Sequence, residues 1–129
     1  MTPSLTAAGV ARARALMSRP STVAGDPESE ARLNVDLGAD PDAAPGPLFH
    51  HLAARTMFFD ELTLAAATSG TSQVVIVGAG YDCRALRFRH AGVRYFELDH
   101  PATQRDKQAR LARLGVDAAD VSVQEVAYN

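Results

Sequence analysis

The stretch that decides the fold is QVVIVGAGYDCRALRF, Gln73 to Phe88. It opens with five strand-forming residues, passes through Gly78, Ala79 and Gly80, and ends in an arginine-rich segment. A short apolar run with β-branched residues is typical of a central strand covered on both faces of a parallel sheet. The glycines that follow predict a tight turn into a short helix. They lie at the carboxyl end of the strand, where open α/β sheets bind ligands.

The sequence after this stretch predicts two further strands. One is Val93–Leu98, VRYFEL, and the other is Asp120–Ala127, DVSVQEVA, whose alternating pattern is typical of a strand near a sheet edge. A helix that begins at Pro101 and closes at Gly115 separates them. Strands alternating with helices predict a parallel sheet with right-handed crossovers, so the expected fold class is α/β.

The sequence before the stretch predicts an N-terminal cap. Helices are expected at Ser4–Ser18 and Leu48–Gly70, and the proline-rich segment between them is expected to be a loop with one helical turn around Ser29–Asp36. Such a long loop often covers a site. We therefore divide the chain into a cap, residues 1–47, and a sheet-containing domain, residues 48–129.

The helix predicted at Leu48–Gly70 carries a charged residue on an apolar stripe. Arg55 lies on that stripe, which is costly for a buried guanidinium unless it is paired or reaches water. Two interpretations remain open: Arg55 binds a ligand carboxylate near the glycine turn, or it forms a salt bridge with Asp60 or Asp82. The apolar members of the stripe are Leu48, Leu52, Phe59, Leu62 and Ala66.

Composition narrows the class of protein. A net charge of −2 gives no electrostatic basis for nucleic-acid binding. The single cysteine, Cys83, cannot form an internal disulfide, which favours a cytoplasmic location, and no apolar run is long enough to span a membrane. No metal is expected, because the four histidines lack ligand spacing and no cysteine or histidine cluster joins them; they are His50, His51, His90 and His100.

The glycine turn and Asp99 are the candidate binding residues. The dinucleotide fingerprint has a third glycine where this chain has Cys83, which weighs against NAD or FAD and leaves S-adenosylmethionine as the adenosine-type ligand to expect. A glycine turn without a ligand is the alternative. Asp99 lies 19 residues after Gly80, where an acid can accept hydrogen bonds from ribose hydroxyls. It could instead cap the following helix.

The residues that follow the glycines are expected to have structural roles instead of binding or catalytic ones. Asp82 and Arg84 are expected to tie the turn to its neighbours, because aspartate in a turn commonly bonds the local backbone. Cys83 has no partner base that the sequence identifies, so a nucleophilic role is not expected. The sequence therefore identifies no catalytic residue.

Three segments together resemble the leucine carboxyl methyltransferase-like family, which has many bacterial members among actinobacterial S-adenosylmethionine-dependent methyltransferases. The segments are RTMFFD, QVVIVGAGYDCRALRF and YFELDHPATQRDKQARL, within Leu48–Leu114. The resemblance implies the N-terminal part of a class I, Rossmann-like methyltransferase sheet with N-terminal cap helices. It also implies S-adenosyl-L-methionine as cofactor, with Arg55 on its carboxylate side, Gly78 in the turn and Asp99 on the ribose.

The resemblance further implies O-methyl transfer to a carboxylate or hydroxyl of a small molecule or protein. A non-catalytic adenosine-binding remnant is the first alternative, and an NAD-dependent oxidoreductase fragment is the second. The family usually has Leu or Met where this chain has Tyr81, and Thr or Ser where it has Cys83. Its members are more than twice as long, so we expect a truncated chain whose first strand, Gln73–Val77, is an exposed apolar edge that favours self-association.

Overall fold

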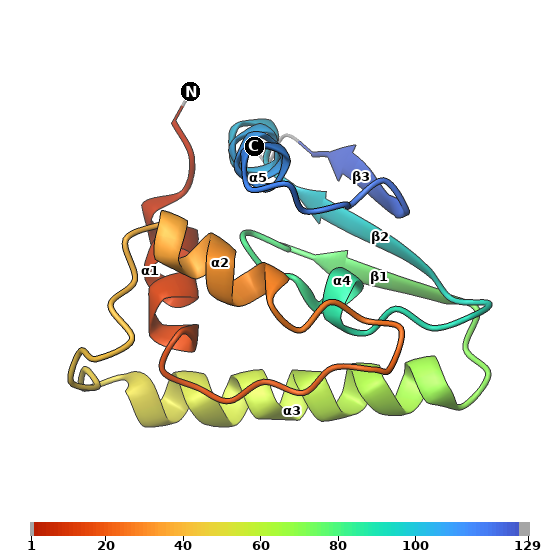
Figure 1. Ribbon diagram of the computed structural model, residues 1–129, viewed down its shortest axis with the longest axis horizontal. Coiled ribbons are helices and arrows are strands. Elements are labelled where there is room, and N and C mark those ends of the chain that lie inside the picture. Colours follow the sequence, from red (N-terminus) through yellow and green to blue (C-terminus); the bar gives the residue numbers. More distant parts are fainter. Residues whose placement is uncertain (1, 127–129) are drawn as a thin grey trace.

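The structure of the chain is a computed structural model that describes residues 2–126, in which a small parallel sheet is flanked by helices (Figure 1). Regular structure begins with two short helices, continues with a long one, and then alternates strands with helices. The elements are α1 Leu5–Arg14, α2 Ser29–Asp36, α3 Phe49–Thr68, β1 Gln73–Val77, α4 Arg84–Arg87, β2 Arg94–Asp99, α5 Pro101–Arg113 and β3 Val121–Glu125.

The three strands form one parallel sheet in the order β1-β2-β3. In the register of the sheet, Val75 of β1 is opposite Phe96 of β2, which is in turn opposite Ser122 of β3. The α/β class, the parallel sheet and the edge position of the third strand are therefore confirmed. The central strand is β2, and β1 lies at the other edge of the described sheet.

The prediction that β1 is covered on both faces is wrong for the described residues. Val74 and Ile76 pack against a buried cluster built around Ala85, Phe88 and Tyr95. Val75 and Val77 point to the opposite face and remain 56% and 71% exposed. Successive side chains of a strand alternate between faces, so one face of β1 is packed and the other faces solvent.

Several element boundaries differ from the sequence prediction. Helix α1 begins at its N-cap Ser4 as expected, but it ends at Arg14 instead of Ser18. Residues Ser29–Asp36 form a regular eight-residue helix instead of one helical turn. Strand β2 extends one residue further than predicted, so that Asp99 is its last residue. For the third strand, the predicted end at Ala127 lies outside the described residues.

The face of α3 that packs against the molecule is not the apolar stripe predicted from its sequence. Leu48, Phe59 and Leu62 are 67%, 43% and 55% exposed. The buried residues of this helix are Thr56, Asp60 and Ala67. The expectation was wrong because arginines from other segments satisfy Asp60, which allows this polar face to be buried.

The cap helices share a core with the sheet-containing part of the chain. Ala11 of α1 and Leu33 of α2 are fully buried, and they pack in one cluster with Tyr81, Leu86 and Leu111. Figure 1 shows α1 and α2 side by side across one end of the molecule, between α3 and α5. The cap therefore lies directly against the segment that follows the glycine turn.

Candidate functional site

The glycine turn connects β1 to α4 and is tied to the end of β2. Gly78 and Gly80 have φ angles of +65° and +53°, a backbone region that side chains strongly disfavour. The N–H groups of Gly78 and Ala79 donate to the carbonyl oxygen of Leu98, at 2.8 and 3.2 Å. The N–H of Gly80 donates to the carboxylate of Asp99. The structure thus brings together four of the predicted site residues: Gly78, Ala79, Gly80 and Asp99.

These contacts determine which ligands the turn can hold. Phosphate-binding turns bind through free backbone N–H groups at a helix N-terminus. Here the N–H groups of the three turn residues are already used by β2. The N–H of Arg84, at the start of α4, donates to Asp82 Oδ1 at 2.6 Å. The geometry therefore does not suit the pyrophosphate of a dinucleotide.

Asp99 ends β2 with a partly exposed carboxylate. Its Oδ1 accepts the N–H of His100 at 2.6 Å, while Oδ2 accepts that of Gly80. The capping side chain of α5 is His100, whose Nδ1 accepts the N–H of Ala102 at 3.3 Å. The helix-cap interpretation of Asp99 is therefore wrong. A carboxylate has about four acceptor positions, so Asp99 retains capacity for further hydrogen bonds.

The two glycines of the turn face different surroundings. A Cβ on Gly78 would have no heavy atom within 4 Å, so this residue borders open space. A Cβ on Gly80 would lie 3.2 Å from the Cβ of Ala7, because α1 packs across the turn at this point. The start of α1 is held in place by Ser4, whose N–H donates to Thr103 Oγ1 at 3.1 Å. A ligand of the turn would approach from the side of Gly78.

Arg55 lies on the exposed side of α3 and borders a small cavity of about 60 Å³. Among residues 2–126 the structure shows no hydrogen bond or ion pair from its guanidinium, so the proposed salt bridge to Asp60 or Asp82 is wrong. No hydrogen bond joins it to the turn glycines in this part of the chain either. The other residues that line the cavity are Val10, Arg14, Leu52, Thr56, Phe59 and Arg84.

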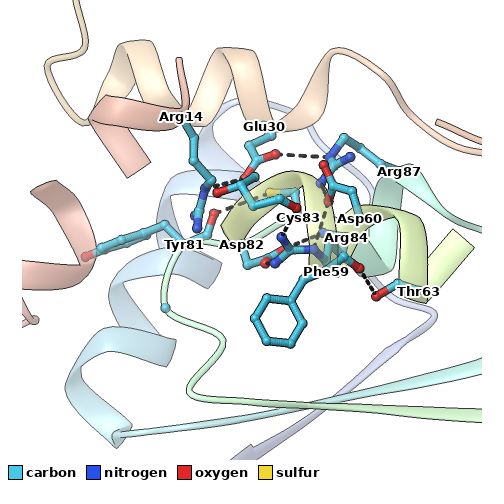
Figure 2. A network of polar contacts seen from close by, with 12 residues as sticks. Arg14, Glu30, Phe59, Asp60, Thr63, Tyr81, Asp82, Cys83, Arg84 and Arg87 are labelled. Carbon is cyan, nitrogen blue, oxygen red and sulfur yellow. Dashed lines mark hydrogen bonds and ion pairs between the residues drawn. The ribbon is translucent and has the colours of Figure 1, made fainter. Parts of the chain in front are cut away.

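A buried network of ion pairs surrounds Asp60 (Figure 2). Arg19 donates to both of its oxygens, from Nε to Oδ2 at 2.6 Å and from Nη2 to Oδ1 at 2.9 Å. Arg84 Nε and Arg87 Nη2 donate to Oδ1 at 2.8 and 3.2 Å. Burial alone would raise the pKa of Asp60, but the Arg19 hydrogen bond and the surrounding arginine charges hold it below its ordinary value.

Glu30 is the second acid of this network, and it connects the network to the cap because it lies on α2. Its Oε2 accepts hydrogen bonds from Arg19 at 2.7 Å and from Arg87 at 3.0 Å. Arg14 Nε lies 3.2 Å from Oε1, an ion pair without hydrogen-bond geometry. Figure 2 shows Arg14 and Glu30 on one side of the network and Asp60 and Arg84 on the other. The cap helices are thus joined to α3 and α4 by buried charges.

Asp82 and Arg84 tie the turn to its neighbours, as predicted. Arg84 forms an ion pair with Asp82, and its Nη2 donates to the carbonyl oxygen of Thr56 at 3.1 Å. The carbonyl oxygen of Asp82 accepts from Lys107, which also pairs with Glu97 at 2.6 Å. Cys83 is fully buried, and burial raises the pKa of its thiol, which keeps it protonated and unreactive.

Sequence reasoning missed most of the residues that hold the turn and the cap together. Arg19 and Glu30 lie in or beside the proline-rich segment, where no periodic pattern marks them. One signal was present: Leu52, Thr56 and Asp60 recur at spacings of four, which places them on one face of α3. That face is the one that packs.

The described part of the chain shows neither a membrane-spanning helix nor a cluster of metal-ligating side chains. None of the helices within residues 2–126 is both long enough and apolar enough to cross a membrane. In the same part of the chain, no three histidine, cysteine, aspartate or glutamate side chains are grouped as metal ligands would be.

Known proteins similar to this chain define its family. The profile of the leucine carboxyl methyltransferase family matches residues 7–129. A protein of Mycolicibacterium gilvum (strain PYR-GCK) is 35% identical over 133 residues, covering 88% of this chain and 43% of the relative. A protein of Mycobacterium sp. (strain KMS) is 38% identical over 132 residues, covering 85% of this chain and 43% of the relative. Both bear the name "Putative S-adenosyl-L-methionine-dependent methyltransferase".

The parallel sheet with its glycine turn is consistent with the N-terminal part of a Rossmann-like methyltransferase fold. The chain belongs to the leucine carboxyl methyltransferase family. It spans about 43% of the length of the two relatives described above.

Proposed function

We propose that this chain carries the S-adenosyl-L-methionine half-site of a methyltransferase, at the carboxyl ends of β1 and β2. The observation that carries the proposal is the pairing of Asp99 with the glycine turn. The turn keeps its own N–H groups occupied, borders open space at Gly78, and holds a carboxylate with unused acceptor positions beside it. This arrangement suits an adenosine ligand that offers ribose hydroxyls and no phosphate.

Arg55 is the residue that would hold the carboxylate of the cofactor. It lines a small cavity together with Arg14 and Arg84, and the charges of those two arginines are already balanced by buried acids. A guanidinium without a partner in the described chain can bind a carboxylate through two parallel hydrogen bonds. The cavity lies beside α1, which also contacts Gly80, so one helix borders both parts of the proposed site.

The bound cofactor would supply an activated methyl group on a sulfonium, and the proposed acceptor is a carboxylate or hydroxyl of a small molecule or protein. A carboxylate acceptor is already ionised near pH 7, so it needs no general base. The contribution of this chain would then be to fix the donor: Asp99 at the ribose and Arg55 at the carboxylate end. Holding donor and acceptor in line can lower the barrier by about 7–11 kcal/mol without acid or base chemistry.

The first prediction concerns Asp99. Calorimetric titration with S-adenosylmethionine is expected to show saturable binding that Asp99→Ala weakens by about tenfold or more, because hydrogen bonds to a charged group contribute about 1.5–3 kcal/mol. Asp99→Ala also removes the acceptor for Gly80, so circular dichroism must show that the variant is folded. Equal affinity of the folded variant would contradict the assigned role, and tighter binding of NAD than of S-adenosylhomocysteine would contradict the cofactor.

The second prediction concerns Arg55. Arg55→Ala is expected to weaken binding of S-adenosylmethionine by about tenfold or more through loss of a charge-assisted pair, and to leave binding of adenosine unchanged. Arg55→Lys should recover only part of the affinity, since an ammonium cannot form the two-point fork. The matched control is Arg105→Ala, which removes an exposed arginine that pairs with Glu125 on another surface. An equal effect of both alanine variants would mean that Arg55 contributes only net charge.

A further inference from the structure

A second cavity, of about 460 Å³, opens between α5, β3 and the loop that joins them. It shares no lining residue with the proposed cofactor site. Figure 1 shows α5 and β3 next to each other at the C-terminal end of the described chain. Apolar side chains form most of the wall: Leu86, Leu111, Ala112, Val116, Ala118, Ala119, Val121 and Val123. A cavity of this volume is within the range of small-molecule sites, which are mostly apolar with a few placed polar groups.

The inner part of this cavity is polar and buried. Gln104, Lys107 and Glu97 line it, with exposed fractions of 0%, 2% and 3%. Lys107 and Glu97 satisfy each other through a 2.6 Å ion pair. Gln104 differs, because both its Nε2 and its Oε1 are buried without a hydrogen-bond partner among the described residues. Buried amides are nearly always paired, so an unpartnered one beside a cavity indicates a place for a ligand group.

We infer that this cavity binds a small neutral amphiphile. The side chain of Gln104, which is fully buried in the structure, turns into the cavity to pair with a planar amide group of the ligand, and the apolar part of the ligand fills the cavity toward its mouth. The amide of Gln104 offers donors and an acceptor side by side, and a ligand amide complements both in one plane. The lining carries two acids, Glu97 and Asp117, against one base, Lys107, so it does not favour an anion. The apolar wall between Gln104 and the exposed residues at the mouth accommodates an aliphatic body.

Octanamide is a suitable probe because it joins a primary amide to an aliphatic chain. In proton–carbon spectra of the whole chain, titration is expected to shift the methyl signals of Ala112, Ala118 and Val121 saturably. The methyls of Val75 and Val77, which belong to an exposed apolar surface elsewhere, should not shift. Equal shifts at both places would mean non-specific hydrophobic association, and no saturable shift would mean that the cavity does not bind this class of ligand. Either result overturns the inference.

Variants test the role of the amide. Gln104→Leu keeps a side chain of similar size without hydrogen-bonding groups, and is expected to weaken octanamide binding at least tenfold while leaving 1-octanol unaffected. Should that variant fail to fold, Ala112→Phe at the exposed mouth is expected to block both probes without touching the amide. Octanoate is expected to bind more weakly than octanamide. Unchanged octanamide affinity in either folded variant, or tighter binding of octanoate, would overturn the proposal.

Discussion

Gly25 shows how a single residue fixes the cap to α4. A Cβ at this position would lie 1.8 Å from the carbonyl oxygen of Arg87, so only glycine permits this approach of two backbones. On either side of it, the N–H of Thr22 donates to Arg87 O and that of Asp26 donates to Leu86 O, each at 2.9 Å. The loop is therefore attached to α4 by backbone contacts that a side chain would separate.

Gly25→Ala is expected to lower the free energy of unfolding by about 1–3 kcal/mol, because the loop must move and its hydrogen bonds to α4 must lengthen. Urea unfolding followed by circular dichroism measures the change. Gly46→Ala is the matched control: its added Cβ would meet nothing within 4 Å, so it should alter stability by less than about 0.5 kcal/mol. Equal stability of the two variants would show that the loop is not held as described.

For single residues, the sequence predicts the place of a side chain in its element better than it predicts which residues that side chain will bond to. Asp99 was singled out from its spacing to Gly80 and its place at the end of a strand, and the structure shows a hydrogen bond between the two residues, while the ribose-binding role stays a prediction. Asp60 could not be assigned, because its partners come from positions 19, 84 and 87, which no local pattern connects. Periodicity identifies which residues lie on the same face of one helix or strand. It does not identify which charged side chains from distant segments will pack against that face.

Strand β1 exposes large apolar side chains at two of its five positions. It is an edge of the described sheet, and Val75 and Val77 expose more than half of their surface. An apolar edge with unpaired backbone groups can pair with another strand. We propose self-association of this chain through β1, by pairing with β1 of a second copy.

Val75→Lys is expected to reduce this self-association while leaving the fold intact, since an exposed lysine on an edge strand opposes pairing. Sedimentation velocity over a range of protein concentrations measures it. Val35→Lys adds the same charge at a comparably exposed position on α2, 59% against 56%, and should have no effect. A wild-type chain that stays monomeric at every concentration would contradict the proposal.

Features of helices and strands that depend on local sequence were predicted correctly, whereas a feature that depends on distant residues was not. The β1 run and the Pro101 start of α5 depend on local sequence alone, and both appear where expected. The packed face of α3 was wrong because burial of that helix depends on Arg19, Arg84 and Arg87, which neutralise Asp60. An apolar stripe predicts the packed face only when no charge network competes for it.

The whole molecule depends on paired carboxylates, which makes its stability dependent on pH. Five aspartates have a pKa below the ordinary value in the folded chain, and arginines are among the groups that lower each of them: Asp36, Asp60, Asp82, Asp106 and Asp120. The unfolded chain therefore binds more protons than the folded chain in the acid range, so unfolding becomes easier as pH falls. Burial raises the pKa of Glu97, which acts in the opposite direction.

The free energy of unfolding is expected to be nearly constant above about pH 5 and to fall progressively as the five aspartates are protonated. Urea midpoints measured between about pH 2.5 and pH 6 would show the slope. Asp60→Asn should make the slope smaller, whereas Asp42→Asn, at an exposed carboxyl without an ion pair in the described chain, should not. A midpoint that rises on acidification would contradict the role given to these pairs.

The charge network around Asp60 also sets the order in which parts of the chain can fold during synthesis. Glu30 leaves the ribosome 57 residues ahead of Arg87, and Asp60 leaves 24 residues ahead of Arg84. Because chain synthesis runs from the N-terminus, both acids can pair with Arg19 at once, but their arginine partners on α4 have not yet been made. The contacts are long-range, so they form late and at an entropic cost. The cap is therefore translated before the glycine turn and α4, and its contacts with α4 cannot form until both have followed it.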